Sequence, residues 1–185
     1  MTIPGLTLAP GYLDDAEQGA LLSVVDAQPW SAELRRRVQH YGHRYDYRRK
    51  TVDPADHLGP LPTWAADLAA RLHADGHAPA TLDQLIVNEY EPGQGIASHV
   101  DCVPCFDDTV LSISLGSSCV MIMSPREGAE KVPLLLEPGA LLVMEGEARY
   151  DWLHGIPARK TDRHDGRVLA RGRRVSLTFR TVVPV

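Results

Sequence analysis

The feature that most constrains the fold is a series of short apolar segments that fills the chain after Pro79. Some alternate apolar and polar residues, others are continuously apolar, and glycine or proline separates them: Leu85–Tyr90, Thr109–Leu115, Cys119–Met123, Val132–Leu136, Ala140–Met144, Tyr150–Leu153 and Arg174–Val183. Strand-like segments at this spacing are typical of an antiparallel sandwich or jelly roll. We therefore expect a mainly β fold with flanking helices (α+β), with a jelly-roll core over about residues 81–185.

The part of the chain before this series, about residues 1–80, favours helices. Apolar residues recur at helical spacing after Asp14, a candidate N-cap, and the pattern stops at Pro29. We expect a second helix over Thr63–His73 with Thr63 as its cap, and an early strand over His40–Tyr47. No linker or internal repeat divides the sequence, so residues 1–185 are expected to form a single domain.

The composition fits an ordinary globular protein. Hydrophobic residues make up 44% of the 185 residues, and no uncharged apolar run is long enough to cross a membrane. The N-terminus has neither the basic nor the apolar region of a signal peptide. Three cysteines cannot all pair within one chain, so a disulfide framework is not expected. We expect a cytoplasmic, monomeric protein without membrane contact.

The charge is unevenly distributed along the chain. Segments 31–50 and 158–180 hold 15 of the 19 lysines and arginines, whereas the rest of the chain has 4 basic and 20 acidic residues. Such clustering indicates a local surface for an anionic partner. The alternative is that both segments are solvated loops whose arginines have no partner.

Three residues form a candidate metal site. His99 and Asp101 are two residues apart, which places them on one face if both lie in a strand, and His154 follows 53 residues after Asp101. Two histidines and one carboxylate make the facial triad that holds non-haem Fe(II) and leaves coordination positions open. The His-x-Asp pair alone is a weak signal, because such pairs are common in strands without a metal.

The segment Arg174–Arg180 strengthens the metal hypothesis. In a strand, Arg174, Ser176, Thr178 and Arg180 share one face and the three apolar residues between them share the other. Two arginines on the polar face of a central strand require anions, and a guanidinium group suits a carboxylate. The alternative is an exposed strand face with solvated arginines. Ser112 and Ser114 are assigned to the core sheet.

These motifs, together with Asn88-Glu-Tyr90-Glu-Pro-Gly-Gln-Gly-Ile96, resemble the AlkB family of Fe(II)- and 2-oxoglutarate-dependent dioxygenases. The resemblance covers about residues 34–183. It implies a double-stranded β-helix core with an N-terminal substrate lid, and Fe(II), 2-oxoglutarate and O₂ as cofactor and cosubstrates. It also implies that the residues contacting 2-oxoglutarate are Asn88, Tyr90, Arg174 and Arg180, to which we add Ser176 on the same strand face. The family reaction releases succinate and CO₂ and hydroxylates a C–H bond; a hydroxylated N-methyl group is then lost as formaldehyde.

The lid segment indicates the class of substrate. Residues 35–47 mix arginines with tyrosines, a combination expected where rings stack on bases and cations contact phosphates. We expect single-stranded DNA or RNA as partner, bound through segments 31–50 and 158–180, with Tyr45 and Tyr47 in the substrate site. Arg149 and Arg126 are further candidates at its mouth. Alternatively, the tyrosines only pack the lid onto the barrel.

One position departs from the familiar DNA-repair members of the family, which carry an acidic residue two positions after the metal aspartate. Here that residue is Val103. The surrounding sequence is more similar to the branch whose catalytic domain hydroxylates a modified wobble uridine in transfer RNA. The expected reaction is thus demethylation of an N-alkylated base or hydroxylation of a modified base. Two alternatives remain: the same chemistry on a protein side chain or small molecule, and a non-catalytic sensor of iron or 2-oxoglutarate.

Cys102-Val-Pro-Cys105 has the spacing of a redox or zinc motif. A thioredoxin-type site requires a helix after the first cysteine, and a zinc site requires two more ligands. We interpret the pair as small residues beside the metal site, sensitive to oxidation if exposed.

Overall fold

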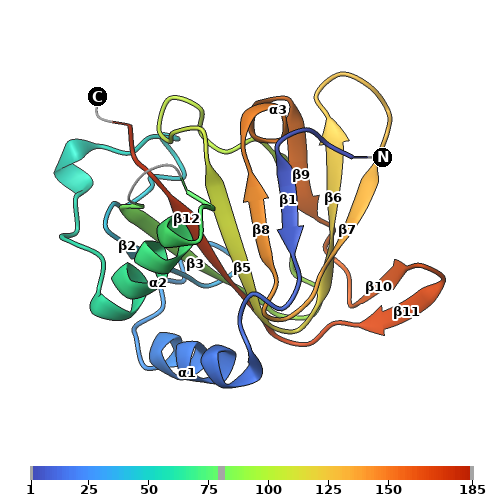
Figure 1. Cartoon of the computed structure of the whole chain (residues 1–185), viewed down its shortest axis with the longest axis horizontal. Coiled ribbons are helices and arrows are strands. Elements are labelled where there is room, and N and C mark those ends of the chain that lie inside the picture. The colour runs from blue at the N-terminus through green and yellow to red at the C-terminus, as the bar shows by residue number, and fades with distance from the viewer. Residues whose placement is uncertain (1, 79–81, 184–185) are drawn as a thin grey trace.

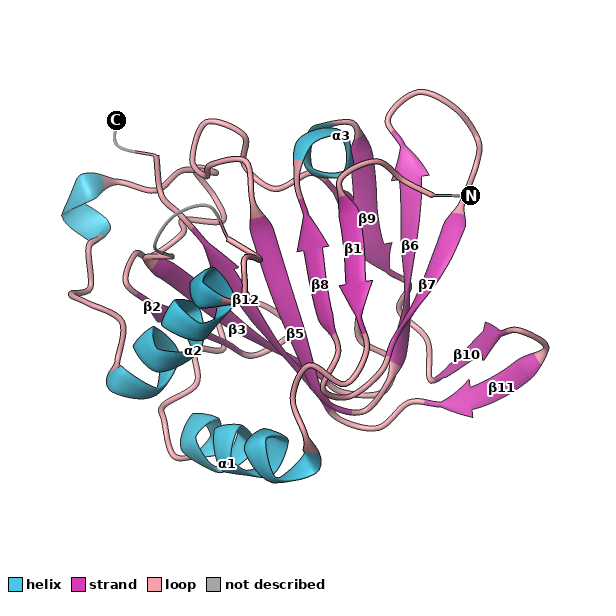
Figure 2. Ribbon diagram, viewed as in Figure 1, coloured by secondary structure: helices cyan, strands magenta, loops and turns pink. Residues whose placement is uncertain are grey.

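The structure, a computed structural model, describes residues 2–78 and 82–183, and antiparallel strands make up most of it (Figures 1 and 2). Two sheets lie face to face, which confirms the jelly-roll expectation. The larger sheet has the order β1-β8-β5-β12-β3-β2, formed by Leu6–Ala9, Leu141–Met144, Val110–Gly116, Arg174–Arg180, Gln84–Tyr90 and Val38–Tyr41. The smaller sheet has the order β4-β9-β6-β7, formed by Ile96–His99, Trp152–Ile156, Cys119–Pro125 and Val132–Leu136.

The central strand β12 has one apolar face and one polar face. Val175, Leu177 and Phe179 are fully buried in a core cluster that includes residues of both long helices. Because side chains alternate across a strand, Arg174 and Arg180 point to the opposite face, toward the smaller sheet. The predicted division of this strand into an apolar and a polar face is confirmed.

The helices lie on the outer face of the larger sheet, as Figure 1 shows for α1 (Asp15–Asp26) and α2 (Thr63–Ala74). Asp14 caps α1 as predicted, and Glu17 completes a capping box. Thr63 was expected to cap α2, but Pro62 occupies that position without a side-chain hydrogen bond. A one-turn 3-10 helix spans Pro54–Asp56 and the short helix α3 spans Gly146–Tyr150.

A second apolar cluster lies between the two sheets. It consists of aromatic, aliphatic and sulfur-containing side chains from both inner faces, among them Val110, Met121, Leu142, Met144 and Trp152. Several of these side chains also line a cavity between the sheets, together with polar side chains of β12, β3 and β9.

Several predicted strands have different bounds in the structure. The early strand predicted over His40–Tyr47 is Val38–Tyr41, so Tyr45 and Tyr47 lie in the loop after it. The strand predicted over Tyr150–Leu153 begins at Trp152, because Tyr150 ends α3.

Three strands were not predicted. These are β1 and the hairpin of β10 (Thr161–His164) and β11 (Arg167–Ala170), which projects from the rest of the molecule in Figure 1. In the described part of the chain, every helix is too short or too polar to span a membrane.

Candidate metal centre and active-site cavity

A cavity of about 400 Å³ opens between the two sheets. Its walls come from the inner faces of β3, β5, β8 and β12, from β4, β6 and β9 opposite, from the loop after β4, and from the segments before and after β2. Both the predicted metal ligands and the predicted 2-oxoglutarate residues line it: His99, Asp101, His154, Asn88, Tyr90, Arg174, Ser176 and Arg180.

The two histidines meet because β4 and β9 pair in antiparallel register. His99 and His154 are direct cross-strand partners, and their ring centroids are 4.4 Å apart. Gly155 permits this approach, since a Cβ there would lie 2.8 Å from the backbone nitrogen of Ser98. The register shift in β4 between Ile96 and His99 marks a bulge, a feature that redirects side chains near active sites.

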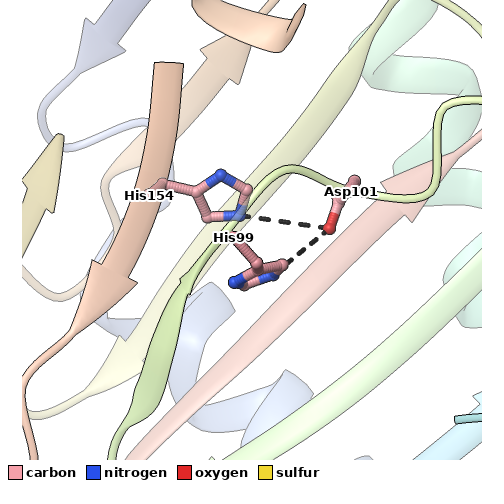
Figure 3. A group of neighbouring side chains, drawn as sticks. All are labelled: His99, Asp101 and His154. Carbon is pink, nitrogen blue, oxygen red and sulfur yellow. Dashed lines mark ion pairs between the residues drawn. The ribbon is translucent and has the colours of Figure 1, made fainter. Parts of the chain in front are cut away.

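Asp101 completes the triad (Figure 3). Its Oδ1 lies 3.5 Å from Nε2 of His99 and 4.0 Å from Nε2 of His154. One ligand atom from each of the three residues lies within 4.8 Å of the others, as a single bound ion requires. Two imidazoles and one carboxylate on one side of an ion fit Fe(II) and leave the side facing the cavity open for other ligands.

The position expected for Asp101, on the same strand as His99, is wrong. β4 ends at His99, so Asp101 does not share a strand face with it. Instead Arg149 holds the loop after β4: its guanidinium donates hydrogen bonds to the backbone carbonyls of Asp101, Cys102 and Phe106 at 3.0, 3.3 and 3.4 Å. Arg149 is 2% exposed and lies outside the cavity lining, so the expected contact with substrate does not fit its position.

The electrostatic environment keeps Asp101 and His154 in the protonation states that bind a cation. Burial alone would raise the pKa of Asp101, but the guanidinium of Arg180, whose Nε lies 2.9 Å from Oδ2, and the two imidazoles hold that pKa well below its ordinary value. Burial lowers the pKa of His154 to about 4, which keeps the imidazole neutral. Metal ligands must be deprotonated, and these two are.

The orientation of His99 is fixed by a second contact. Its Nδ1 lies 2.8 Å from the carbonyl oxygen of Ala97, and because that oxygen can only accept, Nδ1 is the donor. The other ring nitrogen, Nε2, faces Asp101 at a distance of 3.5 Å. Histidines that bind a metal through one ring nitrogen commonly donate a hydrogen bond to a carbonyl group from the other.

The predicted cosubstrate residues come from β3 and β12, which pair directly. Tyr90 lies opposite Arg174 and Asn88 lies opposite Ser176. Arg174 is 3% exposed, and its guanidinium carbon lies 5.5 Å from the centre of the Tyr90 ring. One of its terminal nitrogens donates to Ser114, while its buried Nε has no partner among the described residues. A buried guanidinium with an unused donor can bind a carboxylate.

Two residues of the site were assigned to the core instead. Ser112 lines the cavity and lies 3.4 Å from the hydroxyl of Ser176, and Ser114 accepts the hydrogen bond from Arg174. The signal was present in the sequence, because two serines at alternate positions of an apolar strand mark a polar face.

The loop after β2 closes one side of the cavity. The rings of Tyr45 and Tyr47 both line it and are packed edge to face, 5.2 Å apart, and Tyr45 also lies 5.9 Å from the ring of Phe106. The two tyrosines therefore pack against the barrel and face the cavity, so the two interpretations of this segment are compatible. Arg126 lies outside the cavity lining.

The two basic segments meet at the cavity only in part. Arg36 and Lys50 from the first and Arg174 and Arg180 from the second line it. Several of the others form ion pairs with acidic residues elsewhere: Arg37 and Arg173 with Glu89, Arg44 with Glu33, Arg49 with Asp46, and Arg159 and Arg171 with Asp162. The charge available to a partner is smaller than the sequence suggests.

Cys102 and Cys105 form a disulfide, although a disulfide framework was not expected and the pair was interpreted as incidental. The bridge closes a turn directly after Asp101, and Cys102 lines the cavity. The third cysteine, Cys119, is buried and free.

Comparison with known proteins agrees with this geometry. Residues 5–180 match the model of the 2OG-Fe(II) oxygenase superfamily. The chain is 37% identical over 205 residues to the "Alkylated DNA repair protein ALKBH8 homolog" of Arabidopsis thaliana, with 98% of this chain and 59% of the relative covered. It is 36% identical over 203 residues to the "tRNA (carboxymethyluridine(34)-5-O)-methyltransferase ALKBH8" of Mus musculus, with 97% and 30% covered. The chain thus spans only part of the length of these relatives.

Among solved structures, that of OsALKBH1 superposes with a TM-score of 0.77 at 17% identity and covers 98% of both chains, which supports the fold. The chain belongs to the 2OG-Fe(II) oxygenase superfamily, and its curated relatives place it in the AlkB family within it. Enzymes of this superfamily are dioxygenases that use Fe(II), 2-oxoglutarate and O₂.

Proposed function

We propose that this protein oxidises a modified base in single-stranded nucleic acid, with His99, Asp101 and His154 as the iron ligands. The observation that carries the enzymatic part is the buried guanidinium of Arg174, which faces the same cavity as the triad with an unused donor. A buried, incompletely hydrogen-bonded cation is unfavourable unless an anion binds it. In this proposal that anion is the carboxylate of 2-oxoglutarate farthest from the iron, and Tyr90 and Asn88 contact the same molecule.

His99, Asp101 and His154 would hold the iron, which would activate O₂ as the oxidant of 2-oxoglutarate and of the substrate C–H bond. The residues of this chain hold the metal ligands in position and in the required protonation states. Asp101 stays ionised beside Arg180, His154 stays neutral through burial, and Arg149 holds the backbone carbonyl of Asp101 in place.

The nucleic-acid part of the proposal is supported by the loop after β2. Tyr45 and Tyr47 present rings to the cavity, and rings stack on bases of any identity. Arg36 and Lys50 stand beside them as cations. The mouse relative is named for a uridine derivative in transfer RNA. We propose RNA of this kind ahead of DNA, since Val103 stands where the familiar DNA-repair members of the family carry an acidic residue.

The test measures succinate formed from 2-oxoglutarate with Fe(II) and O₂, with and without single-stranded oligonucleotides that carry modified bases. We expect one oligonucleotide class to stimulate succinate formation and to change in mass by one added oxygen atom or one lost methylene. Succinate formed at a basal rate with every oligonucleotide unchanged contradicts the nucleic-acid substrate and points to a protein or small molecule. Asp101→Ala is the inactive control.

A further inference from the structure

The loop after β4 carries a covalent bond that the proposed function does not use. Cys102 directly follows the metal ligand Asp101, and its sulfur is bonded to that of Cys105. The two cysteines are three positions apart in the sequence, and a disulfide that closes so short a loop removes little entropy from the unfolded chain. Stabilisation of the whole fold therefore does not account for this bond.

The two cysteines differ in their accessibility. Cys102 is partly exposed and lines the cavity, whereas Cys105 is 5% exposed and packs in a small apolar cluster with Val52 and Phe106. A small reagent that enters the cavity reaches Cys102 first. Disulfides with an accessible sulfur are the ones that are reduced and formed again most readily.

Both sulfur atoms lie against one backbone carbonyl group of the loop after β2. The Sγ atoms of Cys102 and Cys105 are 3.4 and 3.7 Å from the carbonyl oxygen of Lys50. In the described part of the chain, no N–H or O–H group donates to the same oxygen. A carbonyl oxygen has two lone pairs and a thiol is a weak donor, so the reduced pair can donate two hydrogen bonds there. The disulfide has no S–H group and can donate none.

The backbone conformation at Lys50 makes this contact important. Its φ angle of 54° is in the left-handed region, which is unfavourable for a residue with a side chain and persists only where surrounding contacts hold it. The N–H group of Lys50 donates to the carbonyl oxygen of Asp46, so the two residues close one turn. Tyr47 lies within that turn and faces the cavity. A change at the cysteines therefore affects the turn that carries this tyrosine.

The metal ligand beside the disulfide is held by other bonds. Arg149 donates to the carbonyl oxygens of Asp101 and Cys102, and the backbone N–H groups of Cys105 and Phe106 both donate to that of Cys102 at 3.2 Å. None of these hydrogen bonds involves a sulfur atom. Reduction of the disulfide therefore leaves Asp101 in place, and the iron site should be the same in both redox states.

We propose that Cys102 and Cys105 form a redox-modification site that controls how firmly residues 44–53, in the loop after β2, are held over the cavity. In the dithiol form both thiols bind the carbonyl group of Lys50 and anchor the loop. In the disulfide form this anchor is lost and the loop opens more often. The inference rests on the proposed function only where it assigns this loop to the substrate.

The oxidant in this proposal is a peroxide and the reductant is a dithiol. Hydrogen peroxide takes two electrons from the two thiols: its O–O bond breaks, the S–S bond forms, and two water molecules leave with the thiol protons. In the reverse reaction a thiolate of the reductant bonds to the sulfur of Cys102, and Cys105 leaves as a thiolate and takes up a proton. The second thiol of the reductant then displaces Cys102, so the reductant ends as a disulfide.

The test compares the wild type with two double variants at Cys102 and Cys105. In one, both cysteines become serine, which donates a hydrogen bond but forms no disulfide. In the other, both become alanine, which does neither. Cys119→Ala is the matched control, because Cys119 is a free, buried cysteine outside the cavity lining.

Each protein is treated without metal, with hydrogen peroxide or with dithiothreitol, and the reagent is removed. Mass spectrometry checks the wild type for the loss of two hydrogen atoms that a disulfide requires. Fe(II) and 2-oxoglutarate are then added without O₂, and amide hydrogen exchange is measured over residues 44–53. The affinities for 2-oxoglutarate and for an oligonucleotide that stimulates succinate formation are measured on the same samples.

We expect exchange over residues 44–53 to be about 2- to 10-fold faster in the disulfide form of the wild type, the change that one or two weak hydrogen bonds produce. The oligonucleotide should bind more weakly by a similar factor, with the affinity for 2-oxoglutarate unchanged. The double serine variant should exchange slowly and the double alanine variant fast, each after either treatment. Cys119→Ala should respond as the wild type does.

Four results would overturn the inference. The first is that peroxide forms no disulfide between Cys102 and Cys105. The second is equal or slower exchange over residues 44–53 in the disulfide form. The third is a response of the double serine variant as large as that of the wild type, which would place the oxidation elsewhere. The fourth is an equal loss of 2-oxoglutarate affinity, which would place the effect at the iron site. All four leave the proposed function standing, whereas that function fails if no oligonucleotide stimulates succinate formation.

Discussion

Replacing Arg174 by methionine tests how the cavity holds its cosubstrate. Methionine has a similar length and no charge, so the change removes the guanidinium with little loss of packing. The structure predicts two opposite effects, because Arg174 is almost fully buried, donates to Ser114 and has an Nε without a described partner.

The first effect concerns 2-oxoglutarate. Removing one partner of a buried, hydrogen-bonded charge pair costs about 2–5 kcal/mol. At about 1.4 kcal/mol for each factor of ten, the dissociation constant should rise by roughly 30- to 3,000-fold. The second effect concerns the protein without 2-oxoglutarate. There the buried guanidinium is unfavourable, so Arg174→Met should raise the free energy of unfolding by about 1–3 kcal/mol.

Calorimetric titration of 2-oxoglutarate without O₂ measures the first effect, and urea unfolding measures the second. Arg173→Met is the matched control. Arg173 is the preceding residue and bonds Glu89 and Asp26 away from the cavity, so its loss should lower stability and leave the 2-oxoglutarate affinity unchanged. An unchanged affinity in Arg174→Met, or a loss of stability, would refute the reasoning.

The same geometry makes three further predictions. Asp101→Ala should abolish iron-dependent succinate formation and lower the free energy of unfolding by about 3 kcal/mol, because Arg180 is left buried without its partner; wild-type turnover in this variant would contradict the triad. Tyr45→Ala should lower the stimulation of succinate formation by oligonucleotide more than it lowers the basal rate, and an equal loss of both would remove Tyr45 from the substrate site. Burial, with Arg44 nearby, lowers the pKa of His40 from 6.5 to about 4, so the unfolded chain binds a proton first as the pH falls. Stability present above pH 6.5 should decline by about 3 kcal/mol toward pH 4, and His40→Gln should show a smaller decline in acid unfolding curves.

Most residues of the site could be predicted from the sequence, because polar and charged side chains of the right type recur at the alternate positions of a strand. The alternation in Arg174–Arg180 predicted both the buried apolar face and the face that lines the cavity. Residue type and spacing identified the triad of His99, Asp101 and His154. However, β4 ends at His99, and a hydrogen bond from Arg149 to its backbone carbonyl holds Asp101 in place.

The parts that could not be predicted depend on contacts between distant segments. Arg149 was assigned to substrate because nothing in its neighbourhood shows that it reaches the carbonyl groups after β4, 43 to 48 residues away in the chain. The basic segments looked available because the acidic partners of Arg173 are Glu89 and Asp26, which lie 84 and 147 residues away. Strand β1 is short, and its pairing with β8 leaves no signal in its own sequence.

The most direct test of the central claim is the ratio of succinate released to modified base oxidised, measured on the same sample of the wild-type protein with Fe(II), O₂ and a limiting RNA oligonucleotide. A dioxygenase that acts on this substrate couples the two products one to one, and Asp101→Ala forms neither. Succinate released with no oxidised base in any RNA or DNA oligonucleotide would contradict the account of the substrate. An Asp101→Ala variant that matches the wild type would contradict the account of the site.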